Sequence, residues 1–244
     1  MKVALITGAS GAIGRETALK FINDGYFTVG QYNNGGDRIE NFISALKTEN
    51  KSDYFFPFRA DLKKAEDCAA LAEFTLKNFG HTDVFVSVAG ADVYKLCTDT
   101  TEKEWDDIFS VNTKSAFLLT KSLLPAMIER KKGALLYVSS IWGVSGACME
   151  TAYSASKAAL IGFCKAIAKE VAPSGITANC VCPGVIDTPM NARFSAEETA
   201  ELIERTPLGR LGTAEEIAAL IYFLCTGAPF VTGQTITADG GFIL

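Results

Sequence analysis

Short, continuous apolar runs alternate with longer segments of helical periodicity along this chain, and this alternation limits the fold more than any other feature. Strands separated by helices of ten or more residues build βαβ units and a parallel sheet. A strand that is apolar at successive positions has helices on both faces. The runs with strand character are Val3–Ile6, Phe27–Tyr32, Tyr54–Arg59, Val84–Val88, Ala134–Ser139, Ile176–Cys182 and Thr235–Thr237. The sequence therefore predicts one α/β domain spanning residues 1–244, with a doubly wound, mostly parallel, seven-stranded sheet flanked by helices.

Helical periodicity is found in a first helix from about Ile13, in the long stretch Thr101–Arg130, and again in Ala152–Val171 and Thr213–Cys225. The long stretch is interrupted by little except Pro125 near its end. The least regular segment is Asp187–Arg210, after the sixth strand. A loop there lies at the carboxyl end of the sheet, where ligands bind. We expect this segment, about 187–210, to be either a substrate lid or a surface loop with two short helical turns.

Composition excludes several classes of function. A net charge of −5 gives no basic surface for nucleic acid. The seven cysteines form no C-x-x-C pair and His81 is the only histidine, so we expect reduced thiols and no metal site. No apolar run reaches the length of about 18 residues that a membrane span needs, and the N-terminal run is too short for a signal peptide. These features indicate a cytoplasmic protein.

A glycine loop, Thr7–Gly14, follows the first strand and opens the first helix. This is the context in which glycines bind a dinucleotide in Rossmann-type folds. Gly8 permits a tight turn, Gly14 permits close packing of the helix on the sheet, and the helix N-terminus attracts the pyrophosphate. The alternative is that these glycines only turn the chain.

The end of the second strand bears on which dinucleotide binds. Sites for NAD carry a carboxylate there, which bonds the ribose 2′-hydroxyl. Here the strand ends in Gly30–Asn34 without an acid, which favours NADP over NAD. Arg38 lies just beyond and either pairs with the 2′-phosphate or is a solvated residue at the start of a helix.

A second constellation carries reactive groups. Tyr153 and Lys157 are four residues apart at the start of a predicted helix, so the phenol and the ammonium share one face. A cation beside a phenol lowers the phenol's pKa, which suits a general acid near neutral pH. Ser140 closes the fifth strand, where its hydroxyl can bond a substrate carbonyl. Asn112 lies inside a long predicted helix and either caps a kink, faces solvent or serves the site.

Together these residues resemble the short-chain dehydrogenase/reductase family, from Thr7 to Gly241. The step of 13 residues from Ser140 to Tyr153 also fits that family. The other matching motifs are Asp61-Leu62, Ala89-Gly90, Pro183-Gly184, Thr232-Gly233-Gln234 and Asp239-Gly240-Gly241.

The resemblance implies a reduction of a carbonyl to an alcohol by NAD(P)H. It implies that Tyr153 protonates the carbonyl oxygen, that Lys157 lowers the tyrosine pKa and holds the nicotinamide ribose, that Ser140 steadies the carbonyl, and that Asn112 positions a water. The residues implied to bind the cofactor are Gly8, Ser10, Gly11, Ile13, Gly14, Asn33, Arg38, Asp61, Leu62, Ala89, Gly90, Tyr153, Lys157, Pro183, Gly184, Ile186 and Thr188.

The chain departs from the family pattern at a few positions. Ala12 replaces the middle glycine of the loop, and Gly11 stands where many NADP users have a basic residue. Ser87 and Val88 replace two asparagines that brace the central sheet in the family. These departures bear on cofactor affinity.

Within the family the chain most resembles 3-oxoacyl-acyl-carrier-protein reductases, through the tail from Pro207 to Gly241. That group implies a homotetramer and an acidic carrier protein as partner, for which Arg130-Lys131-Lys132 is a candidate docking patch. The run around Trp142 and Glu150 resembles a subgroup that reduces a 5-aminopentanone group on elongation factor P. There Glu150 would meet an amine, or it is a solvent-facing acid. A sugar-alcohol or steroid dehydrogenase and a non-catalytic dinucleotide-binding regulator are further alternatives.

Overall fold

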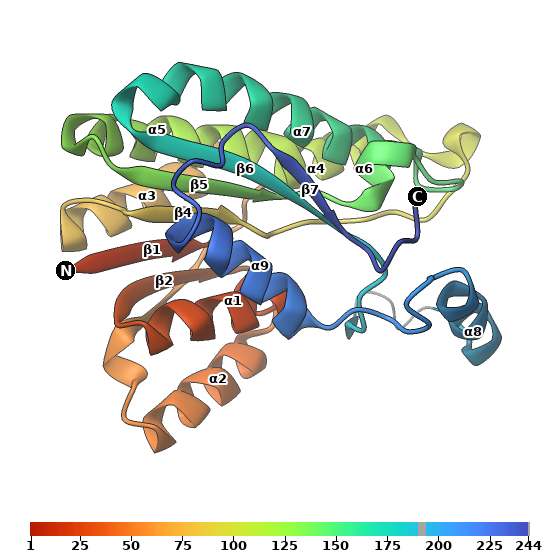
Figure 1. The fold of residues 1–244 in the computed structure, drawn as a ribbon, viewed down its shortest axis with the longest axis horizontal. Coiled ribbons are helices and arrows are strands. Elements are labelled where there is room, and N and C mark those ends of the chain that lie inside the picture. Colours follow the sequence, from red (N-terminus) through yellow and green to blue (C-terminus); the bar gives the residue numbers. More distant parts are fainter. Residues whose placement is uncertain (190–193, 244) are drawn as a thin grey trace.

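The computed structural model describes residues 1–189 and 194–243. One sheet contains seven strands in the order β3-β2-β1-β4-β5-β6-β7, and every pairing between them is parallel. This confirms the predicted doubly wound sheet (Figure 1). The strands are β1 Lys2–Ile6, β2 Tyr26–Tyr32, β3 Phe55–Arg59, β4 Val84–Ser87, β5 Gly133–Val138, β6 Ile176–Pro183 and β7 Thr235–Ala238.

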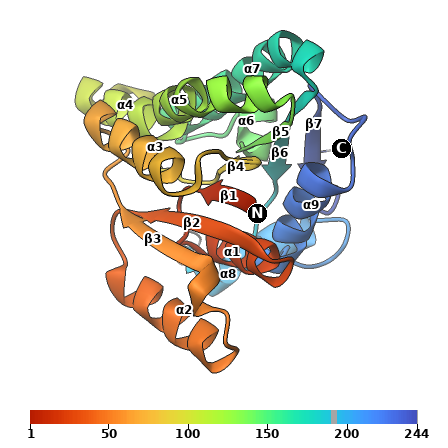
Figure 2. The same ribbon diagram turned by 90° about the vertical axis from the view of Figure 1, so that its left-hand side faces the viewer.

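Helices cover both faces of the sheet (Figure 2). One face carries α1 (Ala12–Asn23), α2 (Gly36–Thr48) and α9 (Ala214–Thr226). The other carries α3 (Ala65–Phe79), α4 (Glu102–Phe109), α5 (Ser115–Arg130) and α7 (Thr151–Val171). Two short helices, α6 (Ile141–Ser145) and α8 (Ala196–Glu204), lie beyond the carboxyl edge of the sheet (Figure 1). Single 3₁₀ turns occupy Ser52–Tyr54, Cys97–Asp99 and Ala172–Ser174.

Alternation along the strands produces two hydrophobic cores. In β4, Phe85 packs with α3, α5 and α7, whereas its neighbours Val84 and Val86 pack on the face covered by α1 and α9. Successive side chains of a strand point to opposite faces, so an apolar run supplies both cores at once. This is the physical reason why the strands of the sequence are continuously apolar.

The long helix predicted over Thr101–Arg130 is interrupted. A π-helical turn, Ser110–Lys114, separates α4 from α5. Turns of this kind insert one residue into the helical ladder and are frequent at functional sites. Helical periodicity does not reveal such an insertion, because the buried face on either side keeps its spacing.

The segment predicted to be least regular, 187–210, contains α8. Ser195 caps this helix with its side chain, and Glu198 bonds back to the backbone N–H of Ser195, which makes a complete capping box. Residues 190–193 of the segment lie outside the described part of the chain. With nine residues, this helix is longer than the two short turns of the surface-loop alternative, and the substrate-lid alternative stays a prediction.

Candidate active site

A cleft of about 1230 Å³ opens at the carboxyl ends of the strands. This edge of a doubly wound sheet is where ligands bind in such folds. All of the site residues predicted from sequence line this cleft, with the exception of Asn112. Groups separated by up to 180 positions in the chain are thus brought to one place, from Gly8 to Thr188.

The glycine loop adopts the close geometry that its residues predict. Gly8 has a φ of +70°, and a Cβ added to Gly14 would stand 2.2 Å from the carbonyl oxygen of Gly8. A side chain at position 14 is therefore excluded, because the helix packs directly on the turn. The hydroxyl of Thr7 accepts the N–H groups of Val88 and Ala89 at 3.0 and 3.1 Å, which ties the loop to the end of β4.

Gln31 is a site residue that the sequence reasoning did not single out. It is 2% exposed, and its side-chain oxygen accepts the N–H of Gly8 at 2.9 Å while its amide donates to the carbonyl of Ala60 at 2.8 Å. The side chain thus holds the glycine loop against β2 and the end of β3. An amide side chain within a mostly apolar strand was the available signal.

The turn after β2 has arginines on two sides. The guanidinium of Arg38 lies against Gly35, where an added Cβ would come within 2.6 Å of Nη2. Arg59, at the end of β3, donates from Nε to the carbonyl of Asn33 at 3.2 Å. The hydroxyl of Ser10 donates to the carbonyl of Asn34 at 3.0 Å. This end of the cleft therefore has cationic and hydroxyl groups beside the position where an NAD site has an acid.

Ser140, Tyr153 and Lys157 lie close together beyond the carboxyl end of β5. Ser140 caps α6, and its hydroxyl oxygen accepts the N–H of Trp142 at 3.1 Å. Lys157 is 3% exposed and donates from Nζ to the carbonyl of Val138 at 2.8 Å. Its ammonium stands 5.6 Å from the centre of the Tyr153 ring. The predicted pairing of phenol and ammonium across one helical turn is present.

Burial sets the charge state of this lysine. Removal from water disfavours the ammonium and lowers the pKa of Lys157 to about 8, while the thiols of Cys180 and Cys182 oppose that shift. Those two residues lie two positions apart on β6 and are fully buried. A hydrogen bond from Cys180 lowers the pKa of Cys182 and raises that of Cys180. The expectation that the buried cysteines are free thiols is met at both positions.

Asn112 lies in the π-helical turn and is 1% exposed. Its Oδ1 accepts the N–H of Ala91 at 2.7 Å, and its Nδ2 donates to the carbonyl of Ala91 and to the hydroxyl of Ser156, both at 2.9 Å. The alternative that this side chain faces solvent is wrong. It joins the loop after β4 to α7, one residue before Lys157.

Gly90 shows how closely these groups converge. A Cβ added there would stand 3.3 Å from Nζ of Lys157 and 3.5 Å from Oδ1 of Asn112. A glycine at this position therefore leaves space between the lysine, the asparagine and the cleft.

The opposite wall of the cleft is formed by two segments that bond to each other. Lys95 donates its N–H to the carbonyl of Met149 at 2.7 Å and pairs with Glu104 on α4 through Nζ at 2.5 Å. Met149 has a φ of +63°, an uncommon conformation for a residue with a side chain. Glu150 follows, is 4% exposed and lines the cleft. The alternative that Glu150 faces solvent is wrong.

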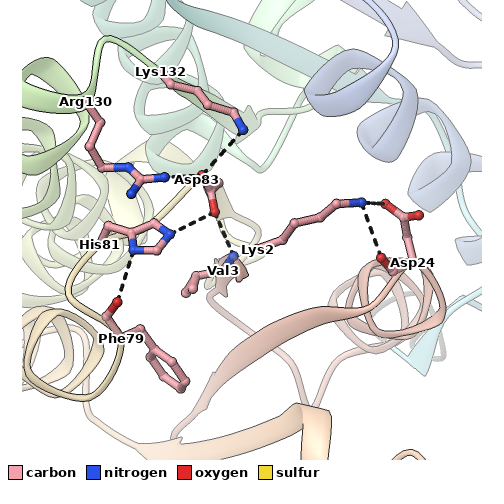
Figure 3. Close-up of polar contacts among 8 residues, drawn as sticks. All are labelled: Lys2, Val3, Asp24, Phe79, His81, Asp83, Arg130 and Lys132. Atoms are coloured by element: carbon pink, nitrogen blue, oxygen red, sulfur yellow. Dashed lines mark hydrogen bonds and ion pairs between the residues drawn. The ribbon is translucent and has the colours of Figure 1, made fainter.

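The candidate docking patch lies at the other edge of the sheet. Arg130 and Lys132 precede β5, and their side chains approach Oδ1 of the buried Asp83 at 3.2 and 3.9 Å (Figure 3). Asp83 also accepts the N–H of Val3 at 2.9 Å and contacts Nε2 of His81 at 3.2 Å. This cluster is at the amino ends of the strands, so it cannot serve the cleft of its own chain. The position of His81 also excludes it as a base in that cleft.

These observations define a dinucleotide-type cleft with a tyrosine, a lysine and a serine at the carboxyl edge of a parallel sheet, which is the arrangement of a nicotinamide-dependent oxidoreductase. Residues 8–243 match the family model described as Enoyl-(Acyl carrier protein) reductase. The chain belongs to the short-chain dehydrogenase/reductase family.

Several relatives match over their full lengths. The chain is 36% identical to 3-oxoacyl-[acyl-carrier-protein] reductase FabG of Thermotoga maritima, covering 100% of this chain and 98% of the relative. It is 34% identical to the protein of the same name in Staphylococcus epidermidis, covering 100% and 99%. It is 36% identical to the oxidoreductase YmfI of Bacillus subtilis, covering 99% and 98%. In the described part of the chain, none of the helices has the length and apolarity to span a membrane.

Proposed function

We propose that this protein reduces a 3-oxoacyl thioester, carried on acyl carrier protein, to the corresponding alcohol with NADPH. The observation that carries the proposal is the placement of Tyr153, Lys157 and Ser140 in one cleft with the glycine loop. Relatives that share about a third of their residues over the full length bear the name 3-oxoacyl-[acyl-carrier-protein] reductase. Both lines of support lead to the same reaction class.

Each residue of the cleft has a separate role in the proposed reduction. Tyr153 donates the proton to the carbonyl oxygen, and the ammonium of Lys157 stabilises the phenolate that remains. Ser140 donates a hydrogen bond to the same oxygen, because its hydroxyl oxygen already accepts from Trp142 and its proton is free to point into the cleft. Asn112 bonds the loop after β4 to α7 and so fixes their relative positions. The nicotinamide, when bound, supplies the hydride.

The chain fits a dinucleotide at the positions where close approach is needed. Gly8, Gly11 and Gly14 leave the N-terminus of α1 open toward the cleft, although Ala12 adds a methyl group there. The 2′-phosphate of NADP fits the turn after β2, where Arg38 lines the cleft and the strand itself ends in Gln31-Tyr32 without an acid. Arg38 and Asn33 are the residues we assign to NADP selectivity, with NAD as the alternative cofactor.

Assembly of copies is a further part of the proposal. Phe223 on α9 is 55% exposed and Phe230, in the loop before β7, is fully exposed. Apolar side chains of this size in water favour association with another surface. A homotetramer would cover them and is tested by light scattering of the purified protein.

The experiment measures NADPH and NADH oxidation with an acetoacetyl thioester, in the wild type and in Tyr153→Phe. Loss of a general acid lowers kcat by about 100-fold or more, while nucleotide binding, followed by fluorescence, is retained through the other residues of the cleft. Turnover with NADPH that disappears in the variant supports the proposal. Turnover that survives Tyr153→Phe would show that another group is the acid.

A second candidate rests on Glu150. A carboxylate that is 4% exposed and lines the cleft three residues before Tyr153 fits a substrate with an amine. Reduction of a 5-aminopentanone group on elongation factor P is such a reaction. Comparing a 3-oxoacyl thioester with an amino ketone as substrates, in wild type and in Glu150→Gln, distinguishes the two. Selective loss of the amino ketone reaction in Glu150→Gln would favour this second candidate.

A further inference from the structure

A series of side-chain contacts connects the C-terminal tail, defined as residues 239–243, to two walls of the cleft. The ring of Phe242 meets the ring of Trp142 edge-on, with centroids 5.7 Å apart at an angle of 80°. The guanidinium of Arg205 lies over Phe242, with Cζ 4.7 Å from the ring centre. Trp142 and Arg205 both line the cleft, from α6 and from the residue after α8. The tail thus supports one arginine at the cleft.

The tail itself is held firmly. The carboxylate of Asp239 accepts the N–H of Gly241 at 3.0 Å and that of Ile243 at 2.9 Å. Gly240 accepts the N–H of Leu208 at 3.1 Å, which joins the tail to the turn after α8. Phe242 therefore has a fixed position, and the arginine that stacks on it loses little further freedom when it binds a ligand.

Arg205 has donors available. Stacking on a ring uses the face of a guanidinium and leaves the N–H groups around its edge free. Within residues 1–189 and 194–243, the side chain of Arg205 makes no hydrogen bond or ion pair besides this stacking contact. By contrast, the side chain of Arg210 is paired with Glu216 at 2.6 Å and does not line the cleft. Among these two neighbouring arginines, only Arg205 is placed to meet a substrate.

We propose that Arg205 is a specificity-determining residue that binds a phosphate group of the thioester substrate at the outer end of the cleft. A planar guanidinium matches two phosphate oxygens and forms charge-assisted hydrogen bonds with them. The phosphate belongs to a pantetheine arm, which a carrier protein and coenzyme A both have. Trp142 and Phe242 are positioning residues for Arg205. This inference rests on the proposed thioester reduction and adds the part of the substrate that is recognised.

The test compares three thioesters as substrates of the protein of residues 1–244. Acetoacetyl-N-acetylcysteamine has no phosphate, acetoacetyl-phosphopantetheine has one, and acetoacetyl-coenzyme A also has the nucleotide phosphates. Arg205→Met keeps an apolar contact with Phe242 and removes the charge. We expect its KM to rise about three- to tenfold for both phosphorylated thioesters, with kcat unchanged, and to change by less than about twofold for the neutral one.

Two variants separate recognition from folding. Phe242→Leu should weaken the preference for phosphorylated thioesters, but less than Arg205→Met does. Phe242→Tyr should retain the wild-type preference, because a tyrosine ring also supports a guanidinium. Arg210→Met is the matched control and should leave all three KM values unchanged. Equal effects of Arg205→Met on neutral and phosphorylated thioesters would overturn the inference. An effect confined to the coenzyme A thioester would overturn the assignment to the pantetheine phosphate.

A binding measurement keeps the inference independent of turnover. In a Trp105→Phe background, Trp142 reports binding through its fluorescence, and 4′-phosphopantetheine is compared with pantetheine. Tighter binding of the phosphorylated compound that is lost in Arg205→Met supports the inference even if no thioester is reduced. Equal binding of the two compounds by the wild type contradicts it, whereas absence of turnover contradicts the proposed function alone.

Discussion

Asn112 is the residue whose removal most directly tests how the site is supported. Replacement by alanine removes two hydrogen bonds to Ala91 and one to Ser156 from a position that is 1% exposed. The N–H and the carbonyl of Ala91, which is half-buried beside the cleft, then lack this partner. A group that water cannot reach costs about 1–3 kcal/mol when it is left unsatisfied. Ser156 keeps its own bond to the carbonyl of Tyr153. We therefore expect Asn112→Ala to lower the free energy of unfolding by about 2–4 kcal/mol.

The assay is urea denaturation followed by circular dichroism, with the slope against denaturant compared between variants. Asn78→Ala is the matched control, because Asn78 is exposed and donates within α3 only to Phe74. It should change the free energy of unfolding by less than about 0.5 kcal/mol. A loss of under 1 kcal/mol in Asn112→Ala would refute the reasoning, since water would then be satisfying Ala91.

The remaining predictions concern a charge, a backbone contact and a buried carboxylate. Burial lowers the pKa of Lys157 from 10.5 to about 8. Between these two pH values the unfolded chain binds more protons than the folded one, so the free energy of unfolding rises with pH. Unfolding measured across this range should show the rise in the wild type and not in Lys157→Met. Gly14→Ala would place a Cβ 2.2 Å from the carbonyl oxygen of Gly8, and NADPH binding measured by calorimetry should be abolished. Gly36→Ala is the control, because a Cβ there meets nothing within 4 Å, and it should bind NADPH as the wild type does. Asp83→Asn should destabilise the fold by about 1–3 kcal/mol in thermal unfolding and leave every KM unchanged, because this cluster lies at the far edge of the sheet; altered KM values would place it in communication with the cleft.

Local pattern was sufficient for the framework of the molecule. Each of the seven predicted strands is present within two residues of its expected ends. Continuous apolar runs favoured strands with two buried faces, and the long helical segments between most of them required crossover connections, which join parallel strands. The glycine loop was also recognisable, because the steric demand of Gly14 comes from Gly8 and Ala9, only six and five positions earlier in the chain.

The orientation of the polar side chains was decided by tertiary structure. Asn112 and Glu150 could each have faced solvent, and the structure buries both, through the π-helical turn and through the strained backbone of Met149. The sequence predicted a docking patch in the basic run that begins at Arg130. The structure places this run at the edge of the sheet opposite to the cleft, where Arg130 pairs with Asp83.

The sequence by itself therefore determined the sheet, its connections and the nature of the reactive groups, because those follow from hydrophobic period and from chemistry that each residue carries alone. Only the tertiary structure decided which polar groups meet. Arg205, Phe242 and Trp142 come from three separate parts of the chain and have no spacing that links them. Their contact follows from how the C-terminal tail crosses the carboxyl edge of the sheet, and a pairing between distant segments leaves no periodic trace in any one of them.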